Sequence, residues 1–109
     1  MSAVVLEASG TQAATISTEH TLATLTGAKV YTLFVDCANM VDGDETELRV
    51  YYTVLAAGTE RLMYPPLVIR NAQSSMIKQS LPIPSDISCK FTLKQTAGTG
   101  RSYAWKVLS

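Results

Sequence analysis

The clearest pattern in the sequence is an alternation of apolar and polar residues between Asp44 and Leu55. A side chain period of two is the repeat of a β-strand with one buried face and one face in water, whereas a helix would scatter these apolar residues around its circumference. The pattern therefore predicts a central strand over residues 44–55. The apolar residues on its predicted buried face are Leu48, Val50, Tyr52 and Val54.

Two later stretches repeat this period of two. Residues 86–95 and residues 101–108 both place apolar side chains on one parity, which predicts a strand in each. Large aromatic residues on the apolar parity of a strand are typical of the core, and we expect this of Tyr52, Phe91 and Trp105. The apolar residues of the two stretches are Ile87, Cys89, Phe91, Leu93, Tyr103, Trp105 and Val107.

Residues 28–37 are apolar on both parities. Val30 and Phe34 alternate with a second apolar set, which indicates a strand in the middle of a sandwich or one whose outer face contacts a partner. Turn residues follow at 42–44, so we expect residues 28–56 to form a hairpin-like pair. The second apolar set consists of Tyr31, Leu33, Val35 and Cys37.

The other segments give weaker signals. Pro65 and Pro66 cannot donate hydrogen bonds to a neighbouring strand, so their segment is predicted to lie at an edge or a bulge. Residues 82–85 contain two further prolines and are expected to be a stiff connector, and residues 1–10 an edge strand or an extended arm. The remaining segments with the composition of strands are residues 11–17, 20–26, 61–69 and 76–81.

Together these segments predict an all-β fold in one domain. Strands separated by Gly, Pro, Asp and Asn turns, without a convincing helical period, are typical of an antiparallel β-sandwich. A chain of 109 residues is the size of a single domain. We expect seven to eight strands over residues 1–109, with an immunoglobulin-like or a jelly-roll topology.

Composition narrows the possible partners. The chain is 47% hydrophobic and 17% charged, which favours a folded globule over a disordered one. Nine basic and nine acidic residues cancel, so no basic surface for nucleic acid or anionic lipid is expected. No apolar run approaches the roughly 20 residues of a membrane span, and no secretory leader is recognisable at the amino terminus. These features predict a cytoplasmic protein that binds neither nucleic acid nor membranes.

Residues with catalytic or metal-binding potential are few. Cys37 and Cys89 are best interpreted as small buried hydrophobes, although a disulfide stays possible. His20 is the single histidine and has no acidic residue at a telling spacing, which favours a structural role. The acidic residues of 36–47 lack the ligand order of a calcium loop, so a solvated turn is favoured over bound calcium. We therefore predict no enzyme, no catalytic residue, no cofactor and no metal site.

Four segments together resemble a known family. The sequence is similar to small proteins of tailed bacteriophages that are encoded among virion structural genes, namely head decoration (cement) or minor capsid proteins. The resemblance covers residues 20–109, is most specific at the carboxyl end, and carries no catalytic or ligand residue. The segments that carry it are Val41–Tyr51, Pro84–Ile87, Lys90–Arg101 and Trp105–Leu108.

This resemblance implies a mechanical function on the surface of a virion. A decoration protein assembled in the host cytoplasm would form a homo-oligomer, a trimer or a dimer, and would bridge subunits of the major capsid protein. The alternative is a tail- or fibre-associated sandwich that binds a host glycan or another virion protein. Besides the amino-terminal arm, the residues predicted at the interface are Tyr51, Met63, Tyr64, Pro65 and Pro66.

Overall fold

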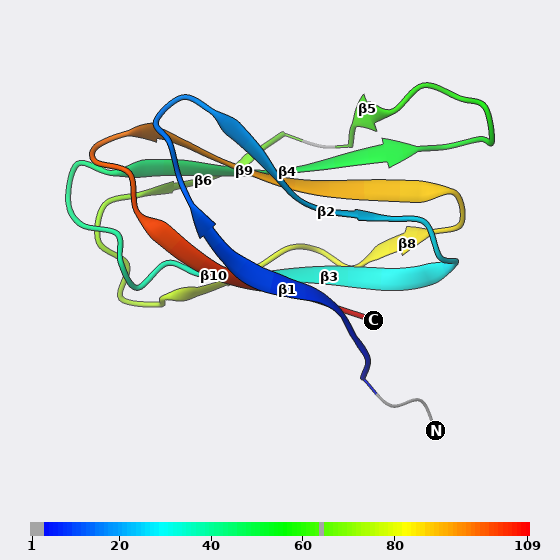
Figure 1. Ribbon diagram of the computed structural model, residues 1–109, viewed down its shortest axis with the longest axis horizontal. Helices are drawn as coiled ribbons and strands as arrows, with labels where there is room; N and C mark the ends of the chain where they lie inside the picture. The colour runs from blue at the N-terminus through cyan, green and yellow to red at the C-terminus, as the bar shows by residue number, and fades with distance from the viewer. Residues whose placement is uncertain (1–3, 64) are drawn as a thin grey trace.

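The alternating segments of the sequence form the central strands of two antiparallel sheets that pack face to face (Figure 1). The computed structural model describes residues 4–63 and 65–109, and this part of the chain contains no helix. The prediction of an all-β sandwich is thus confirmed. The strands are β1 (Leu6–Ala13), β2 (Glu19–Leu25), β3 (Lys29–Asp36), β4 (Glu45–Thr53), β5 (Arg61–Leu62), β6 (Leu67–Arg70), β7 (Ile77–Gln79), β8 (Ile83–Ser85), β9 (Ser88–Ala97) and β10 (Ser102–Leu108).

Each sheet has five strands in the described part of the chain. The first sheet has the order β1-β10-β3-β7, with β8 also paired to β3. The second sheet has the order β2-β9-β4-β5, with β6 also paired to β4. The described residues therefore form ten strands rather than the predicted seven to eight. The difference comes from short edge strands, which lie in segments that were predicted as a single strand or as a connector.

The core lies between the two sheets and follows the predicted parity. Leu48 and Val50 of β4 are buried, as are Tyr31 and Leu33 of β3, while Tyr52 and Trp105 are partly buried against this core. Val54 is an exception, because β4 ends at Thr53 and the Val54 side chain is 71% exposed in the following loop. The fully buried hydrophobic side chains of β9 and β10 are Cys89, Phe91, Leu93, Tyr103 and Val107.

The expected pairing of residues 28–56 is wrong. β3 pairs with β10, β7 and β8 in the first sheet, whereas β4 pairs with β9, β5 and β6 in the second. The connection over residues 37–44 therefore crosses between the sheets. Cys37 and Met40 are buried in this connection, so these two side chains extend the core at one end of the sandwich. A hairpin would have kept both residues within a single sheet.

The prolines lie at the margins of the sheets. β5 and β6 both pair with β4 and leave a break around Pro65 and Pro66, which agrees with the predicted edge position. The segment 82–85, in contrast, is not merely a connector, because Ile83–Ser85 forms β8 against β3. Pro84 is tolerated there because β8 is an edge strand and needs hydrogen bonds on one side only.

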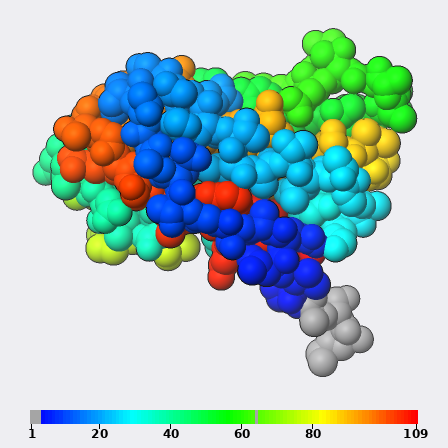
Figure 2. All heavy atoms as spheres, in the orientation of Figure 1, coloured from blue at the N-terminus to red at the C-terminus, as the bar shows by residue number. Residues whose placement is uncertain are grey.

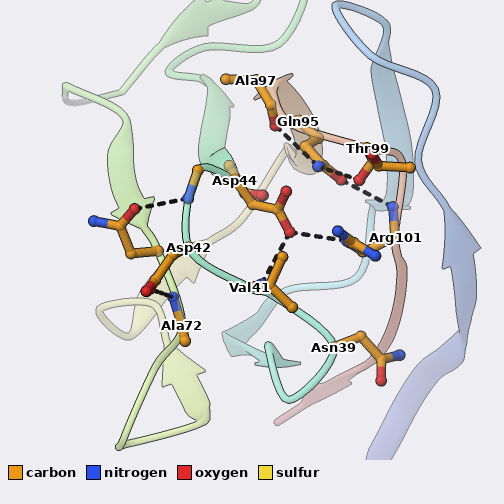
Figure 3. A network of polar contacts seen from close by, with 12 residues as sticks. Asn39, Val41, Asp42, Asp44, Ala72, Gln95, Ala97, Thr99 and Arg101 are labelled. Carbon is orange, nitrogen blue, oxygen red and sulfur yellow. Dashed lines mark hydrogen bonds and ion pairs between the residues drawn. The ribbon is translucent and has the colours of Figure 1, made fainter.

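A cluster of buried polar residues joins one end of the two sheets (Figure 3). We call it the end cluster and define it by residues at the start of β4, at the end of β9 and in or just before β10. Of its members, Arg101 alone reaches solvent to a notable extent. The end cluster consists of Asp44, Thr46, Gln95, Arg101 and Tyr103.

Asp44 holds the crossing connection in the end cluster. Its carboxylate Oδ2 accepts hydrogen bonds from the Val41 amide (3.0 Å) and from Arg101 Nε (2.9 Å). Burial by itself would raise the pKa of Asp44, but these two donors together bring that pKa below its usual value. The carboxylate is therefore charged and bonded through Oδ2 in the fold, even though the residue is only 2% exposed.

Gln95 fills the space between Asp44 and the core. Its Nε2 donates to the carbonyls of Ala97 (3.0 Å) and Thr99 (2.7 Å), and its Oε1 accepts from the Arg101 amide (3.0 Å) and the Tyr103 hydroxyl (2.9 Å). Because the Tyr103 proton is committed to Gln95, the Thr46 hydroxyl must be the donor in its 2.8 Å contact with Tyr103. Every group of the buried amide thus has a partner, which fixes the β9–β10 turn.

We predict that Gly98→Ala destabilises the fold far more than Gly43→Ala. Both glycines have positive φ, at 88° and 97°, so both substitutions carry the cost of a left-handed backbone, about 1–2 kcal/mol. At Gly98 a Cβ would also lie 1.9 Å from Asp44 Oδ1, whereas at Gly43 no atom lies within 4 Å. Urea unfolding should show an additional loss of about 1–3 kcal/mol for Gly98→Ala. Equal losses in the two variants would contradict this account.

We also predict that Asp44→Asn removes an acid-sensitive part of the stability. A carboxylate with a lowered folded-state pKa stabilises the fold above its unfolded pKa of about 3.9, and this contribution is lost as the pH falls through the folded value. At pH 7 the variant should lose about 2 kcal/mol. The difference from the parent chain should shrink below about pH 4 in unfolding curves. Asp42→Asn, at an exposed carboxylate, is the control and should change stability by about 0.5 kcal/mol or less.

Candidate interaction surface

The outer face of the second sheet is polar and internally bonded. Glu19 of β2 accepts hydrogen bonds from the hydroxyls of Tyr51 and Thr92, both at 2.6 Å, and from Arg49 at 3.2 Å. The Lys90 ammonium lies 4.6 Å from the centre of the Tyr51 ring. Both the hydroxyl and one ring face of Tyr51 are thus occupied by residues of the same chain.

The charges on this face balance each other. Burial acts to raise the pKa of Glu19, but the hydroxyls of Thr92 and Tyr51 and the nearby Arg49 lower it overall. Arg49 also contacts Glu47 at 3.0 Å, and Lys90 contacts Glu60 at 3.0 Å. Arg49 Nε is buried without a hydrogen-bond partner, and Leu62 lies beside Tyr51 on this face and is 45% exposed. A face whose charged groups are mostly paired gains little by giving up water to a partner.

The outer face of the first sheet contains a largely apolar groove. Phe34 alternates with the buried Leu33 and Val35 on β3 and so points away from the core. Leu6 lies directly opposite Leu108 across β1 and β10, and Leu6 and Ile77 are 59% and 60% exposed. These side chains line a shallow groove of about 640 Å³ together with Ala104 and the stem of Lys106. We call it the first-sheet groove.

Polar groups are few in the first-sheet groove. The Lys106 ammonium lies 5.8 Å from the centre of the Phe34 ring. Ser9 of β1 also lines the groove, as does Asp36, which lies on β3 between Ala104 of β10 and Ile77 of β7. Contiguous exposed apolar side chains within a polar rim are the usual mark of a protein interaction site. This groove is therefore the surface of the described residues that is best suited to a protein partner.

No family model, curated protein or solved structure matches this chain. The function has to be inferred from the molecule itself. Among the described residues, no helix is long and apolar enough to cross a membrane.

The residues with catalytic potential lie apart and are otherwise engaged. His20 Nε2 accepts a hydrogen bond from the Thr15 amide at 3.1 Å, which fixes the turn between β1 and β2. Cys37 and Cys89 are free, buried thiols, and burial raises the pKa of Cys37 to about 11 and also raises that of Cys89. Neither thiol is therefore a thiolate nucleophile near neutral pH.

The acidic turn is bonded to its surroundings. Asp44 is held in the end cluster, and Asp42 accepts a hydrogen bond from the Ala72 amide at 3.3 Å. Over residues 4–63 and 65–109, His, Cys, Asp and Glu side chains form no group of three that could hold a metal ion. Of the two, Asp44 holds the β3–β4 crossing, whereas the Asp42 side chain is exposed and its bond to Ala72 lies at the surface.

The interface residues predicted from the sequence lie on the second sheet and its edge. Tyr51 is half-buried on the outer face of β4, Met63 is 42% exposed at the end of β5, and Pro65 is exposed in the break before β6. Pro66 is half-buried beside it, and Tyr64 lies outside the described residues. None of the four that can be placed lines the first-sheet groove.

The sequence predicted only part of the first-sheet groove. The apolar outer parity of residues 28–37 pointed to Phe34 and to an outer face in contact with a partner. Leu6 and Ile77 fall in strands that are too irregular or too short to show a parity, with a register shift after Leu6 and three residues in β7. Their contribution becomes visible only when β1 and β7 are placed beside β10 and β3.

We predict that the first-sheet groove binds apolar probes. Replacing Leu6 and Ile77 together by threonine should lower the fluorescence of the uncharged dye Nile red, because the dye loses two walls of a concave surface. The matched control replaces Val54 and Leu55, each 71% exposed in the loop after β4. Both double variants should keep their folding stability to about 0.5 kcal/mol per residue. An equal loss of dye signal in the two variants would contradict a specific groove.

Proposed function

We propose that this chain is a non-enzymatic structural protein of a bacteriophage virion, a decoration or cement protein of the head. It forms a homo-oligomer on the capsid surface and stabilises the head by bridging subunits of the major capsid protein. The resemblance of residues 20–109 to such proteins supports this assignment. The observation that carries the proposal is the difference between the outer faces of the two sheets, since one carries a network of paired charges and the other an open, largely apolar groove.

The two faces suit the two environments of a decoration protein. The first-sheet groove, with Leu6, Phe34 and Ile77, can bury apolar area against a coat subunit. The second sheet keeps the paired network of Glu19 and Arg49 in contact with water. Where several copies engage one lattice at once, modest contacts combine into firm attachment.

The described side chains also favour binding over catalysis. His20 is bonded to a backbone amide, and the two thiols are buried in the core. The described histidine and the two thiols therefore do not form the pair of base and nucleophile that cysteine-based covalent catalysis requires. The alternative function, recognition of a glycan by an exposed tyrosine, gains no support from Tyr51, because Lys90 lies over one face of its ring and its hydroxyl is bonded to Glu19.

The test is co-sedimentation of the purified chain with expanded heads of the phage that encodes it, depleted of this protein. The parent chain should bind at micromolar concentration. The Leu6→Thr, Ile77→Thr double variant should bind roughly tenfold more weakly, because two groove contacts are truncated. The Val54→Thr, Leu55→Thr variant is the matched control and should bind like the parent.

Absence of binding by the parent chain at micromolar concentration would contradict a decoration role. Binding that is equally weakened in both double variants would contradict the groove as the coat-facing surface. A glycan array probed with the same sample provides the comparison with the alternative function, and specific glycan binding without head binding would favour a tail or fibre module.

A further inference from the structure

β1 is an edge strand with an uncovered side. Within the described residues it pairs with β10 only, and Figure 2 shows its atoms, in dark blue, at the surface of the molecule. Its eight residues include one charged side chain, Glu7, which is already bonded to Lys29 and Ser109. Edge strands of soluble monomers usually carry charges, prolines or bulges that prevent pairing with another chain.

The register identifies which backbone groups of β1 bond to no neighbouring strand, and among these the Ala13 carbonyl accepts only the exposed Gln12 side-chain amide at 3.0 Å. Gly10 and Gln12 lie opposite Trp105 and Tyr103, and the Ala14 amide donates to the Arg101 carbonyl. Since antiparallel bonding alternates along a strand, the even-numbered residues bond to β10. The amides and carbonyls of Ser9, Thr11 and Ala13 therefore point outward, away from the sheet.

The other edges of the sandwich are interrupted. β5 and β6 are separated by the segment with Pro65 and Pro66, and β7 and β8 are three residues each, with Pro84 in β8. β2 has a register shift between Thr21 and Ala23, in the middle of the strand. The register shift of β1 lies near its start, between Leu6 and Ala8, and the strand is regular from Ala8 to Ala13. β1 is therefore the edge with the longest regular stretch available to pair with another strand.

We propose that β1 is a dimerisation edge that pairs antiparallel with β1 of a second copy of this chain. A two-fold axis at Thr11 places Thr11 opposite its own counterpart and Ser9 opposite Ala13. This register brings all three outward-facing residues into hydrogen-bonded pairs, each of which exchanges both N–H···O bonds. The facing side chains are small and uncharged, and cross-strand threonine pairs are favourable.

The self-complementary edge is what identifies the occupant as a second copy. An isologous contact needs a patch that fits itself, and a charged edge would place like charges opposite one another. Ser9 belongs both to this edge and to the lining of the first-sheet groove. Pairing would therefore join the two first sheets into one sheet and place their apolar outer faces side by side. This inference rests on the proposed assembly function and names the surface of self-association.

The test uses opposite charges at the symmetry axis. The parent chain should have twice its 11.8 kDa mass in sedimentation equilibrium at high micromolar concentration. Thr11→Lys alone and Thr11→Glu alone should each weaken the dimer roughly tenfold or more, because like charges then face each other. An equimolar mixture of the two variants should restore the dimer. Thr24→Glu, on the exposed edge strand β2, is the matched control and should remain dimeric.

Three results would overturn the proposal: a monomeric parent chain, a trimeric one, or a dimer that persists in both single variants. Failure of the mixture to restore the dimer, with both variants folded by thermal unfolding, would overturn it as well. Head binding distinguishes this inference from the proposed function. A parent chain that binds heads as a monomer refutes edge pairing alone, whereas a dimer without affinity for heads refutes the decoration role alone.

Discussion

The buried carboxylate of Asp44 is the constraint on which the arrangement of both sheets depends. A charge that is excluded from water must have donors placed around it, and here they come from the crossing connection at Val41 and from Arg101 just before β10. Gln95 extends this bonding to Tyr103 in the core. Arg101 lies just before β10, and β10 pairs with both β1 and β3. The bond between Arg101 and Asp44 therefore also helps to place the strands that line the first-sheet groove.

The same network explains why β3 and β4 are not a hairpin. Asp44 also bonds through its backbone, where its carbonyl accepts from the Asn71 amide at 2.9 Å. The start of β4 is thereby held against the segment after β6 and beneath the β9–β10 turn. Gly98 allows this close approach, since a side chain there would occupy the position of the carboxylate. The crossing connection that ends at Asp44 and the turn at Gly98 thus pack directly against each other.

The sequence predicted what depends on local periodicity and missed what depends on pairing. The parity of Leu48 and Val50, and of Cys89 and Phe91, follows from the two-residue repeat of a strand with one buried face, so these strands and their core faces could be predicted. The partner of β3 could not, because turn residues at 42–44 suit a hairpin and a crossing equally well. The groove was partly visible through Phe34, but its remaining walls come from strands that are neighbours only in the folded sheet.

The surface features are best understood as properties of a molecule that is covered on one side. An open apolar groove and an edge strand with a single charge both favour aggregation when they stay exposed to water. Here both belong to the first sheet, and the second sheet has its polar groups bonded to one another. Equal numbers of basic and acidic residues add little electrostatic repulsion between copies. Such a distribution is costly for a solitary protein in solution, but it suits one whose first sheet is buried against neighbours while its second sheet stays in contact with solvent.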